Sequence, residues 1–248
     1  MIPWHPQVKI IKEQSGVFMI YKPCKVLSHP NDNVLFKQSL IQAPYDPSRQ
    51  AYRTSEGLIY LLNRLDSPTS GIVVLSKNDT LAKQIRKLFK EHKVKKTYQA
   101  IVKGYFIGKN ICWRDKLQIK KSGQQLRTFC GFSPESVSAK TIVNEIETFQ
   151  LCGEDFSLIQ LKPFTGRTHQ LRVQCAQHHF PILGDKTYGD FKCNRRTNAD
   201  RLFLHACSIE FSLLGQTFAC TCEPEFSTYI QKTGQKNLNF SHPKDRNP

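Results

Sequence analysis

The sequence predicts a mixed α+β fold, in which a strand-rich and mostly antiparallel central sheet is flanked by helices and loops. Three observations predict it. Short apolar runs of strand type recur along the chain, at residues 17–21, 57–62, 71–75, 97–102 and 156–161. Helical spacing of apolar residues is clearest in two stretches, 78–89 and 168–178. Several strands therefore follow one another without a helix between them, which is typical of antiparallel connections.

Two of the predicted strands enclose a short turn-rich segment. The runs at 57–62 and 71–75 are apolar and of strand type, and the residues between them include Asp66. Pro68 and Gly71 force the chain to turn there. We therefore expect Asp66 to lie on a tight connection between two buried strands.

The predicted domain organisation is simple, because no internal repeat and no convincing domain boundary is visible. Residues 29–57 are rich in Pro, Asn, Asp, Ser and Gln, and we expect them to form a long irregular surface loop. We expect a short N-terminal extension at 1–16, one domain at 17–230, and a loosely held polar tail at 231–248.

The first predicted helix is amphipathic and basic. Asn78 or Asp79 is expected to cap it. Its apolar residues recur at helical spacing, at Leu81, Ile85, Leu88 and Phe89. Its other face carries lysines. The strictly alternating strand 97–102 follows and is stopped by Gly104.

The C-terminal half is predicted to add strands and a second helix. Residues 111–148 suggest two or three half-buried strands joined by turns. Thr168 is expected to cap a helix that ends near His178. Two further core strands are expected at 202–206 and 209–211.

Charge is the most informative feature of the composition. The 248 residues can bury a real core, and 36 basic against 20 acidic residues leave a net charge of +16. Part of this surplus is clustered between Lys83 and Lys96, where Glu91 is the single acid. Such a field favours a polyanionic partner with salt-dependent binding. An anionic membrane is the main competitor, but it requires an amphipathic helix with an exposed aromatic face, which is hard to reconcile with a helix inside a domain.

Other classes of protein are disfavoured. The longest apolar runs are too short to cross a bilayer, and the N-terminus lacks a signal pattern, so we expect a cytoplasmic protein. The nine cysteines are scattered and contain no C-x-x-C pair. They are interpreted as small core residues or free thiols, and neither structural zinc nor disulfides are expected.

Three local patterns carry polar groups that could do chemistry, and each also has a purely structural interpretation. Asp66 is either a turn-forming residue or a carboxylate nucleophile, placed on the same strand face as Arg64. Residues 166–172 form either a polar helix end or an anion site with Arg167 at its mouth. Tyr98 is either a core residue or an aromatic surface on which an unpaired base could stack.

The pattern at 166–172 does not favour a metal. His169 and Arg172 are three residues apart and share a helical face. His169 has no second ligand at helical spacing, because His178 and His179 lie too far along the chain. No metal site is expected.

Taken in order, these motifs resemble the RluA family of RNA pseudouridine synthases. The resemblance covers roughly residues 17 to 211. It rests on YKP and HP within residues 21–30, NRLD and TSG within 63–71, KTYQAIVKG at 96–104, GRTHQLR at 166–172 with PILGD and YG up to residue 189, and RLFLHA at 201–206. The resemblance implies the pseudouridine synthase catalytic fold, with the active-site cleft across the sheet.

Two departures from the family pattern are visible. Asn63 stands where the family usually has His, and Cys24-Lys25 replaces the small residues common after Lys22-Pro23. We expect Asn63 to tune RNA contacts without loss of activity. About sixteen residues precede Val17, too few for the S4-type RNA-binding domain of many relatives, so the catalytic domain is expected to supply its own RNA contacts.

The resemblance also implies roles for individual residues. Asp66 would attack the ribose C1′ or remove a proton from C2′ of a flipped-out uridine, Tyr98 would stack on the base and help remove the C5 proton, and Arg172 would pair with Asp66. Seven further residues are expected to contact RNA: Asn63, Arg64, Lys87, Lys90, Lys96, Arg167 and His169.

The implied enzyme is a monomer that acts on a structured tRNA or rRNA stem-loop and needs no metal or other cofactor. The alternatives are a non-catalytic RNA-binding or ribosome-assembly factor on the same fold and, more remotely, a glycosidase-like hydrolase. The first would not need Asp66, Tyr98 and Arg172 together. The second usually requires two carboxylates that flank the scissile bond.

Overall fold

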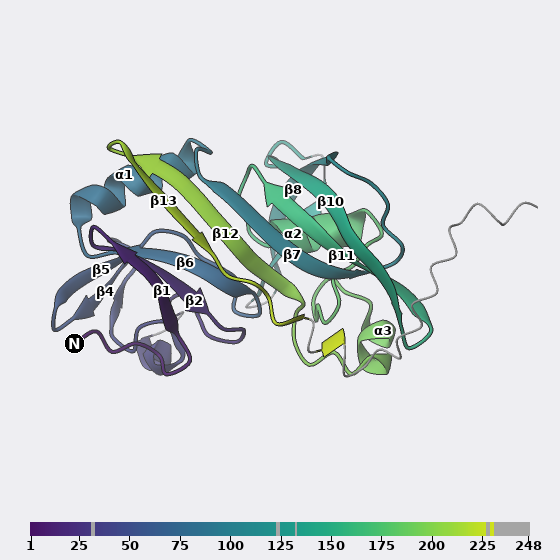
Figure 1. Cartoon of the computed structure of the whole chain (residues 1–248), viewed down its shortest axis with the longest axis horizontal. Helices are drawn as coiled ribbons and strands as arrows, with labels where there is room; N and C mark the ends of the chain where they lie inside the picture. The colour runs from purple at the N-terminus through teal and green to yellow at the C-terminus, as the bar shows by residue number, and fades with distance from the viewer. Residues whose placement is uncertain (31–32, 123–124, 132, 227–228, 231–248) are drawn as a thin grey trace, which may run out of the picture.

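A computed structural model of the chain describes residues 1–30, 33–122, 125–131, 133–226 and 229–230. Thirteen strands form one continuous sheet (Figure 1). The strands are β1 (Lys9–Gln14), β2 (Val17–Lys22), β3 (Tyr45–Asp46), β4 (Ala51–Thr54), β5 (Gly57–Leu61), β6 (Ser70–Ser76), β7 (Lys95–Lys103), β8 (Ile111–Ser122), β9 (Gln125–Cys130), β10 (Val137–Leu151), β11 (Glu154–Pro163), β12 (Leu204–Leu213) and β13 (Gln216–Thr221). Within the described residues, every ladder between strands is antiparallel except that of β6 with β12. The predicted mixed, mostly antiparallel α+β fold is confirmed.

Within the described ranges, three α-helices and a short 3-10 helix accompany the sheet. They are α1 (Asp79–Lys90), α2 (Gln170–Gln177), α3 (Phe191–Arg196) and the 3-10 helix η1 (Asn33–Gln38). α1 packs against β5, β6 and β12, whereas α2 packs against β8 and β9. Both helices lie behind the sheet in Figure 1. α3 and the edge strand β1 were not anticipated from the sequence.

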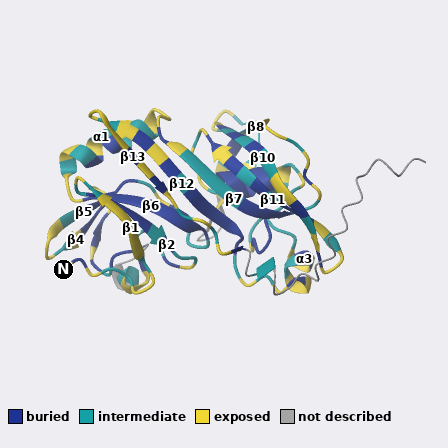
Figure 2. Cartoon of the chain, viewed as in Figure 1, coloured by how far each residue is buried: buried dark blue, intermediate teal, exposed yellow. Residues whose placement is uncertain are grey.

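α1 agrees with its prediction in detail. Asn78 is the cap, and its side-chain oxygen accepts a hydrogen bond of 2.9 Å from the backbone N–H of Leu81. Ala82 and Ile85 are fully buried against the sheet, while the lysine side faces solvent (Figure 2). The amphipathic pattern was therefore sufficient to locate the helix.

The prediction for residues 29–57 was wrong in part. This segment contains η1, β3 and β4, and Tyr45 and Tyr52 are buried within it. β4 pairs with β5, and the Tyr52 hydroxyl donates a 2.5 Å hydrogen bond to the Ser28 carbonyl. The strands are two and four residues long, so their alternation is too short to stand out from the surrounding polar residues.

The predicted cap of the second helix was also wrong. α2 begins at Gln170, and its N-cap is His169 in the left-handed region at φ 55°. The Thr168 carbonyl instead accepts a hydrogen bond from the Thr128 hydroxyl. The chain thus turns sharply at His169, which points this histidine along a different direction from a regular helical residue.

The central strand is β12, which lies between β6 and β7. Residues 204–206 and 209–211 of the two expected strands are parts of this one element, with a register shift between Ala206 and Ser208, whereas Leu202 and Phe203 precede it. The middle of the sheet along β6 and β12 is buried (Figure 2). β12 therefore joins the half of the sheet that holds α1 to the half that holds α2.

The connection that carries Asp66 leaves the sheet at a fork. β6 pairs with β5 through Leu75 and Ser76, but with β12 through Ser70 and Gly71. Residues 62–69 emerge between these two pairings. Both ends of this connection are held on buried strands. The exposed residues in its middle therefore have little conformational freedom.

The expected division into 1–16, 17–230 and 231–248 stays a prediction. Within the first sixteen residues, β1 pairs with β2 and extends the same sheet. The predicted polar tail at 231–248 lies outside the described residues.

Candidate active site

The loop that carries Asp66 is shaped by hydrogen bonds to its own backbone. The Thr69 N–H donates to the Asp66 carbonyl at 3.0 Å, which closes the predicted turn. The Asn63 side-chain oxygen accepts from the Val74 N–H at 2.7 Å and so takes the place of a strand carbonyl opposite β6. The Asn63 side chain therefore helps to hold this loop against β6.

A buried lysine donates hydrogen bonds to the backbone of the same loop and of the segment after β2. Lys22 is fully buried, and its Nζ donates to the carbonyls of Pro23, Val26 and Ser67 at 3.0, 2.7 and 3.0 Å. Burial lowers the pKa of Lys22 to about 7, while the nearby Asp66 carboxylate opposes this shift. Because Ser67 follows Asp66 directly, this lysine fixes the backbone at the candidate nucleophile.

Arg172 joins Asp66 to a second carboxylate. Its Nη1 lies 3.3 Å from Oδ2 of Asp66, and its Nε and Nη2 each donate to Asp185 at 2.8 Å. Burial alone would raise the pKa of Asp185, but the bidentate guanidinium keeps that pKa below its ordinary value. The Asp66 side chain is 28% exposed, against 6% for Arg172 and 1% for Asp185. Asp66 is thus the end of the buried cluster that can reach a substrate.

His169 and Tyr188 form a second contact with the same carboxylate. The Tyr188 hydroxyl oxygen accepts from the Thr128 N–H at 2.9 Å and lies 2.8 Å from Nδ1 of His169. Nε2 of His169 lies 3.8 Å from Oδ2 of Asp66. Burial lowers the pKa of His169, although Asp66 opposes the shift. If the Tyr188 proton is donated to Nδ1, the neutral ring directs its Nε2–H toward Asp66.

Tyr98 and Lys96 lie two residues apart on β7, so their side chains are on the same face of the strand. Both line the same pocket. Burial and the Asp66 charge raise the pKa of Tyr98, so its hydroxyl is protonated at neutral pH. Burial lowers the pKa of Lys96 to about 8, and its Nζ has one long contact of 3.4 Å with the Thr165 carbonyl. Lys96 is therefore a cation that an incoming anionic group can engage.

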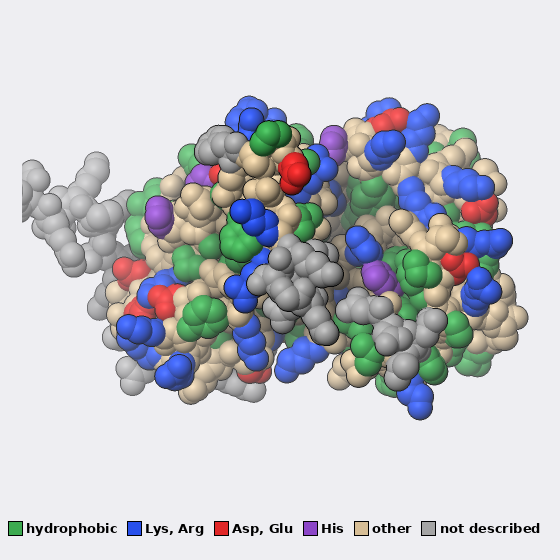
Figure 3. Space-filling model, turned by 180° about the vertical axis from the view of Figure 1, so that it is seen from behind, with side chains coloured by type: hydrophobic (Ala, Val, Ile, Leu, Met, Phe, Trp, Pro, Cys, Tyr) green, Lys and Arg blue, Asp and Glu red, His purple; other side chains and the backbone are tan. Residues whose placement is uncertain are grey.

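Two adjoining hollows bring these groups together. The narrow pocket has a volume of about 110 Å³ and is lined by Asp66, Tyr98, Lys96 and Arg172 among others. It opens into a groove of about 660 Å³ that Arg64, Arg167 and Lys90 border. Figure 3 shows lysine and arginine side chains on both sides of a hollow between the two halves of the molecule. The predicted cleft across the sheet is thus basic.

The structure places nearly all the residues predicted from sequence at this cleft. The narrow pocket is lined by Arg64, Asp66, Lys96, Tyr98, Arg167, His169 and Arg172. Asn63 and Lys90 line the groove. Lys87 lines neither hollow, and its Nζ lies 3.8 Å from Glu91 within α1.

Sequence reasoning gave no role to Lys22, Asp185 or Tyr188. Each lies in a block that carried the family resemblance, which was the available signal. Their contacts depend on long-range folding: Arg172 and Asp185 meet through α2 and the loop after it, and Lys22 reaches Ser67 across β2 and β6.

The described part of the chain adds two further observations. No group of three or more His, Cys, Asp or Glu side chains there is arranged to hold a metal ion. None of the helices in these residues is long and apolar enough to span a membrane.

Comparison with known proteins identifies the fold and family. The model of the RNA pseudouridylate synthase family matches residues 16–177, which include Asp66, Tyr98 and Arg172. The chain belongs to this family. The human RNA pseudouridylate synthase domain containing 1 superposes with a TM-score of 0.71 at 25% identity, over 89% of this chain and 84% of that one.

Curated relatives of this family member include enzymes with different RNA targets. The tRNA pseudouridine synthase C of Vibrio parahaemolyticus is 33% identical over 162 residues, or 62% of this chain and 66% of the relative. The ribosomal large subunit pseudouridine synthase D of Borreliella burgdorferi is 32% identical over 223 residues, or 87% of this chain and 64% of the relative. In both cases the match spans just under two thirds of the relative's length.

Proposed function

We propose that this protein isomerises a specific uridine to pseudouridine in a tRNA or rRNA stem-loop, with Asp66 as the catalytic carboxylate. The observation that carries the proposal is the narrow pocket, where Asp66 is the single carboxylate among the described lining residues and is paired with Arg172 opposite Tyr98. Family membership supports the reaction. The tRNA and rRNA relatives support both substrate classes.

Asp66 begins the reaction paired with Arg172. It either bonds to the ribose C1′ or takes the C2′ proton, and in both routes the C1′–N1 bond breaks and uracil carries the electron pair away. The freed ring turns within the pocket and C5 bonds to C1′. In the first route this breaks the Asp66–C1′ bond, and in the second route Asp66 returns the proton to C2′. The C5 proton is then lost and N1 gains a proton. The Arg172 contact at 3.3 Å holds the carboxylate in place during these steps.

Tyr98 is proposed to hold the base, because its ring borders the narrow pocket next to Asp66. Its protonated hydroxyl has no hydrogen-bond partner among the residues that the structure describes, so it is free to contact the substrate. A uridine reaches this pocket after it leaves its stack, which costs on the order of a few kcal/mol and least in a loop.

The groove is proposed to bind the phosphate backbone. Arg64, Arg167, Lys90 and Lys96 line it, and Asn63 lies at its edge. Cationic side chains in a groove release counterions on binding, so affinity should fall steeply with salt. His169, at the entrance of α2, completes the proposed RNA contacts.

The proposal also covers partners and location. Asp66, Tyr98 and Arg172 come from one chain, which supports action as a monomer. The proposed chemistry moves protons and one glycosidic bond, and it requires no metal or other cofactor. RNA is the proposed partner, and the cytoplasm is the proposed location.

Tritium release from RNA labelled at uridine C5 tests the assignment. Total RNA from cells that lack the gene is the substrate, and Asp66→Asn is expected to abolish release while RNA affinity stays within a few-fold. The exposed Asp155, outside both hollows, provides a matched control as Asp155→Asn, which should release tritium at the wild-type rate. Release by Asp66→Asn at the wild-type rate would contradict the proposal. Mapping pseudouridines in cells with and without the gene then identifies the RNA.

A further inference from the structure

A third hollow adjoins the groove on the side away from Tyr98. It has a volume of about 180 Å³, and Pro47, Leu61 and Leu62 form apolar walls beside His29 and Tyr45. We call it the aromatic hollow. Arg64 lines the narrow pocket, the groove and the aromatic hollow, so its side chain separates the catalytic pocket from this third space.

The His29 ring is fixed, and both of its nitrogens are used. Nδ1 lies 3.1 Å from the Pro30 carbonyl and must donate to it, so Nε2 accepts from Nη1 of Arg64 at 3.0 Å. The ring is stacked on Tyr45 at a centroid distance of 4.9 Å and an angle of 13°. Tyr45 in turn meets Tyr52 edge to face. A ligand in the hollow can therefore contact the face of the His29 ring, whereas the two ring nitrogens already have hydrogen-bond partners.

The aromatic hollow is hydrogen-bonded to the loop that carries Asp66. The Ser28 hydroxyl donates to the Leu65 carbonyl at 2.8 Å, and the Leu65 N–H donates to the Ser28 hydroxyl oxygen at 3.0 Å. Ser28 precedes His29 and Leu65 precedes Asp66. The two hydrogen bonds between Ser28 and Leu65 therefore fix the position of His29 in the aromatic hollow relative to Asp66.

The rim of the hollow is also held in place. Asp46 accepts hydrogen bonds from the Ser48 and Arg49 N–H groups, which closes the turn after β3. Nη2 of Arg86 donates to the carbonyls of Gln50 and Leu61 at 3.0 Å each. The hollow is thus a preformed feature, as small-molecule and base sites usually are.

The chemistry of the lining suits a neutral aromatic ring. No described residue that lines the hollow is acidic. Besides the His29 ring and the Tyr45 hydroxyl, its polar groups are the Gln50 and Asn63 amides and the Arg64 guanidinium. The Asn63 oxygen is already bonded to the Val74 N–H, so its amide nitrogen is left to donate. Apolar walls, one stacked aromatic pair and a few hydrogen-bonding groups are what an unpaired nucleobase requires.

We propose that the aromatic hollow is a second nucleobase subsite, which receives the unpaired base adjacent to the target uridine and packs it against the His29–Tyr45 pair. The inference rests on the proposed action on RNA. Arg64 would lie between the two extruded bases, because it lines both spaces. The subsite would make recognition depend on a nucleotide that is not itself modified.

Fluorescence of 2-aminopurine provides the test. The probe is a stem-loop RNA with a single loop uridine and 2-aminopurine on its 5′ or its 3′ side, and the Asp66→Asn protein is used so that no turnover occurs. We expect fluorescence to be quenched on binding at one of the two positions. His29→Leu should remove that quenching and weaken binding about ten-fold, whereas His5→Leu, outside the three hollows, should change neither.

An abasic nucleotide at the quenched position closes a double-mutant cycle. Wild-type affinity should fall about ten-fold on abasic RNA, and His29→Leu should then cause no further loss. Equal losses for His29→Leu on intact and abasic RNA, or no quenching at either position, would overturn the subsite. Tritium release by the wild-type protein would persist in that event, so failure of the subsite is distinguishable from failure of the proposed function.

Discussion

At the scale of single residues, the cluster around Arg172 shows how one buried cation serves two carboxylates. Asp185 takes the bidentate contact at 2.8 Å, and Asp66 takes the remaining amino group at 3.3 Å. A lysine has no planar fork and could not satisfy both partners at once. The identity of the basic residue is therefore dictated by the second carboxylate, which never reaches the substrate.

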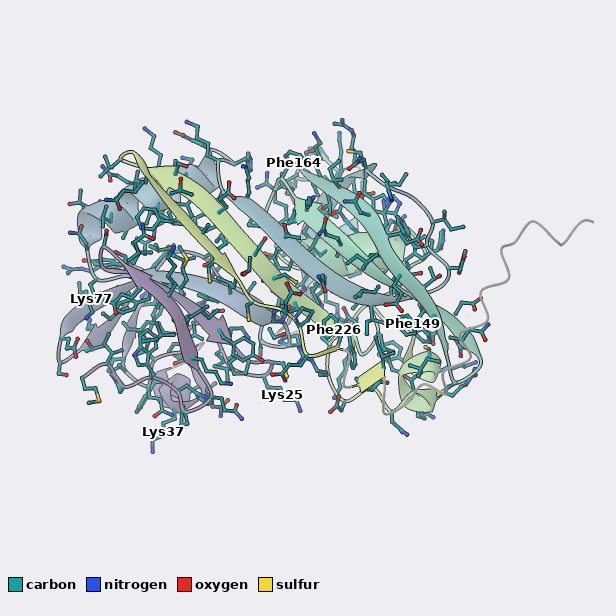
Figure 4. The ribbon with its side chains drawn as sticks, in the orientation of Figure 1. Lys25, Lys37, Lys77, Phe149, Phe164 and Phe226 are labelled. Atoms are coloured by element: carbon teal, nitrogen blue, oxygen red, sulfur yellow. The ribbon has the colours of Figure 1, made fainter. Side chains whose placement is uncertain are left out.

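A second buried cluster lies where β12 begins. The His205 Nε2 donates to the Cys222 carbonyl at 2.9 Å, so its Nδ1 must accept from the Ser70 hydroxyl at 2.7 Å. Nη2 of Arg201 donates to the same hydroxyl oxygen at 2.6 Å. Phe226 packs edge to face on His205 near the start of β12 (Figure 4). This cluster holds the start of β6 in place, directly after the loop that carries Asp66.

His205 predicts an acid-sensitive fold. Burial and the nearby Arg201 charge lower its pKa from 6.5 to about 4, although the Cys222 contact opposes the shift. As the pH falls below 6.5, the unfolded chain binds the proton before the folded protein does, so stability falls between pH 6.5 and about 4. The full loss from this group is on the order of 3 kcal/mol.

Urea unfolding at several pH values between 4 and 7.5 checks this prediction. His205→Gln should be less stable than the wild type at pH 7.5 but should lose less stability on acidification. The other histidines are common to both proteins, so the difference in slope belongs to His205. Parallel curves for the two proteins would contradict the assignment.

At the scale of elements, α1 offers a matched pair of lysines. Lys90 borders the groove and has no ion-pair partner in the described part of the chain, whereas Lys87 lies outside and pairs with Glu91. Lys90→Glu is expected to weaken RNA binding and to reduce the salt slope by about 1. Lys87→Glu should have a much smaller effect. Filter binding across a salt series measures both, and equal effects would show that the helix contacts RNA along its whole length.

The elements differ in how well the sequence predicts them, for physical reasons. α1 was located correctly because its apolar spacing, cap and lysine face are all local. The segment 29–57 was not, because Tyr45 and Tyr52 are buried by partners elsewhere in the chain. His169 was not recognised as the N-cap because a left-handed residue there is held by the Tyr188 contact, nineteen positions along the chain.

The candidate site divides in the same way. Asp66, Tyr98 and Arg172 were predicted from the order of their motifs, and the structure brings them to one pocket. Lys22 and Asp185 act through these residues and not on a substrate. No local pattern distinguishes such a lysine or aspartate from an ordinary turn residue, since burial and long-range partners define its role.

At the scale of the whole molecule, Gly71 joins the two halves of the sheet. Its φ is +120°, and an added Cβ would lie 2.4 Å from the Ala206 carbonyl oxygen in the β6–β12 ladder. Gly71→Ala is expected to cost about 3 kcal/mol or more, because the strand pairing cannot widen without separating the halves. Chemical denaturation measures the loss.

Gly16 supplies the matched control. Its φ is +75°, but an added Cβ would meet nothing within 4 Å. Gly16→Ala should therefore cost only the backbone strain of about 1–2 kcal/mol. A loss for Gly71→Ala no greater than that for Gly16→Ala would show that the contact between the halves is readily deformed.

The central place of β12 has a consequence for synthesis on the ribosome. β6 and β7 are neighbours of β12, yet they are translated more than a hundred residues before it. Until β12 emerges, both carry open edges, and the pairings that complete the sheet are among the most distant in the chain. Asp66 lies on one half and Arg172 on the other, and β12 pairs with both halves. We therefore expect the proposed activity to appear only in chains long enough to include β12.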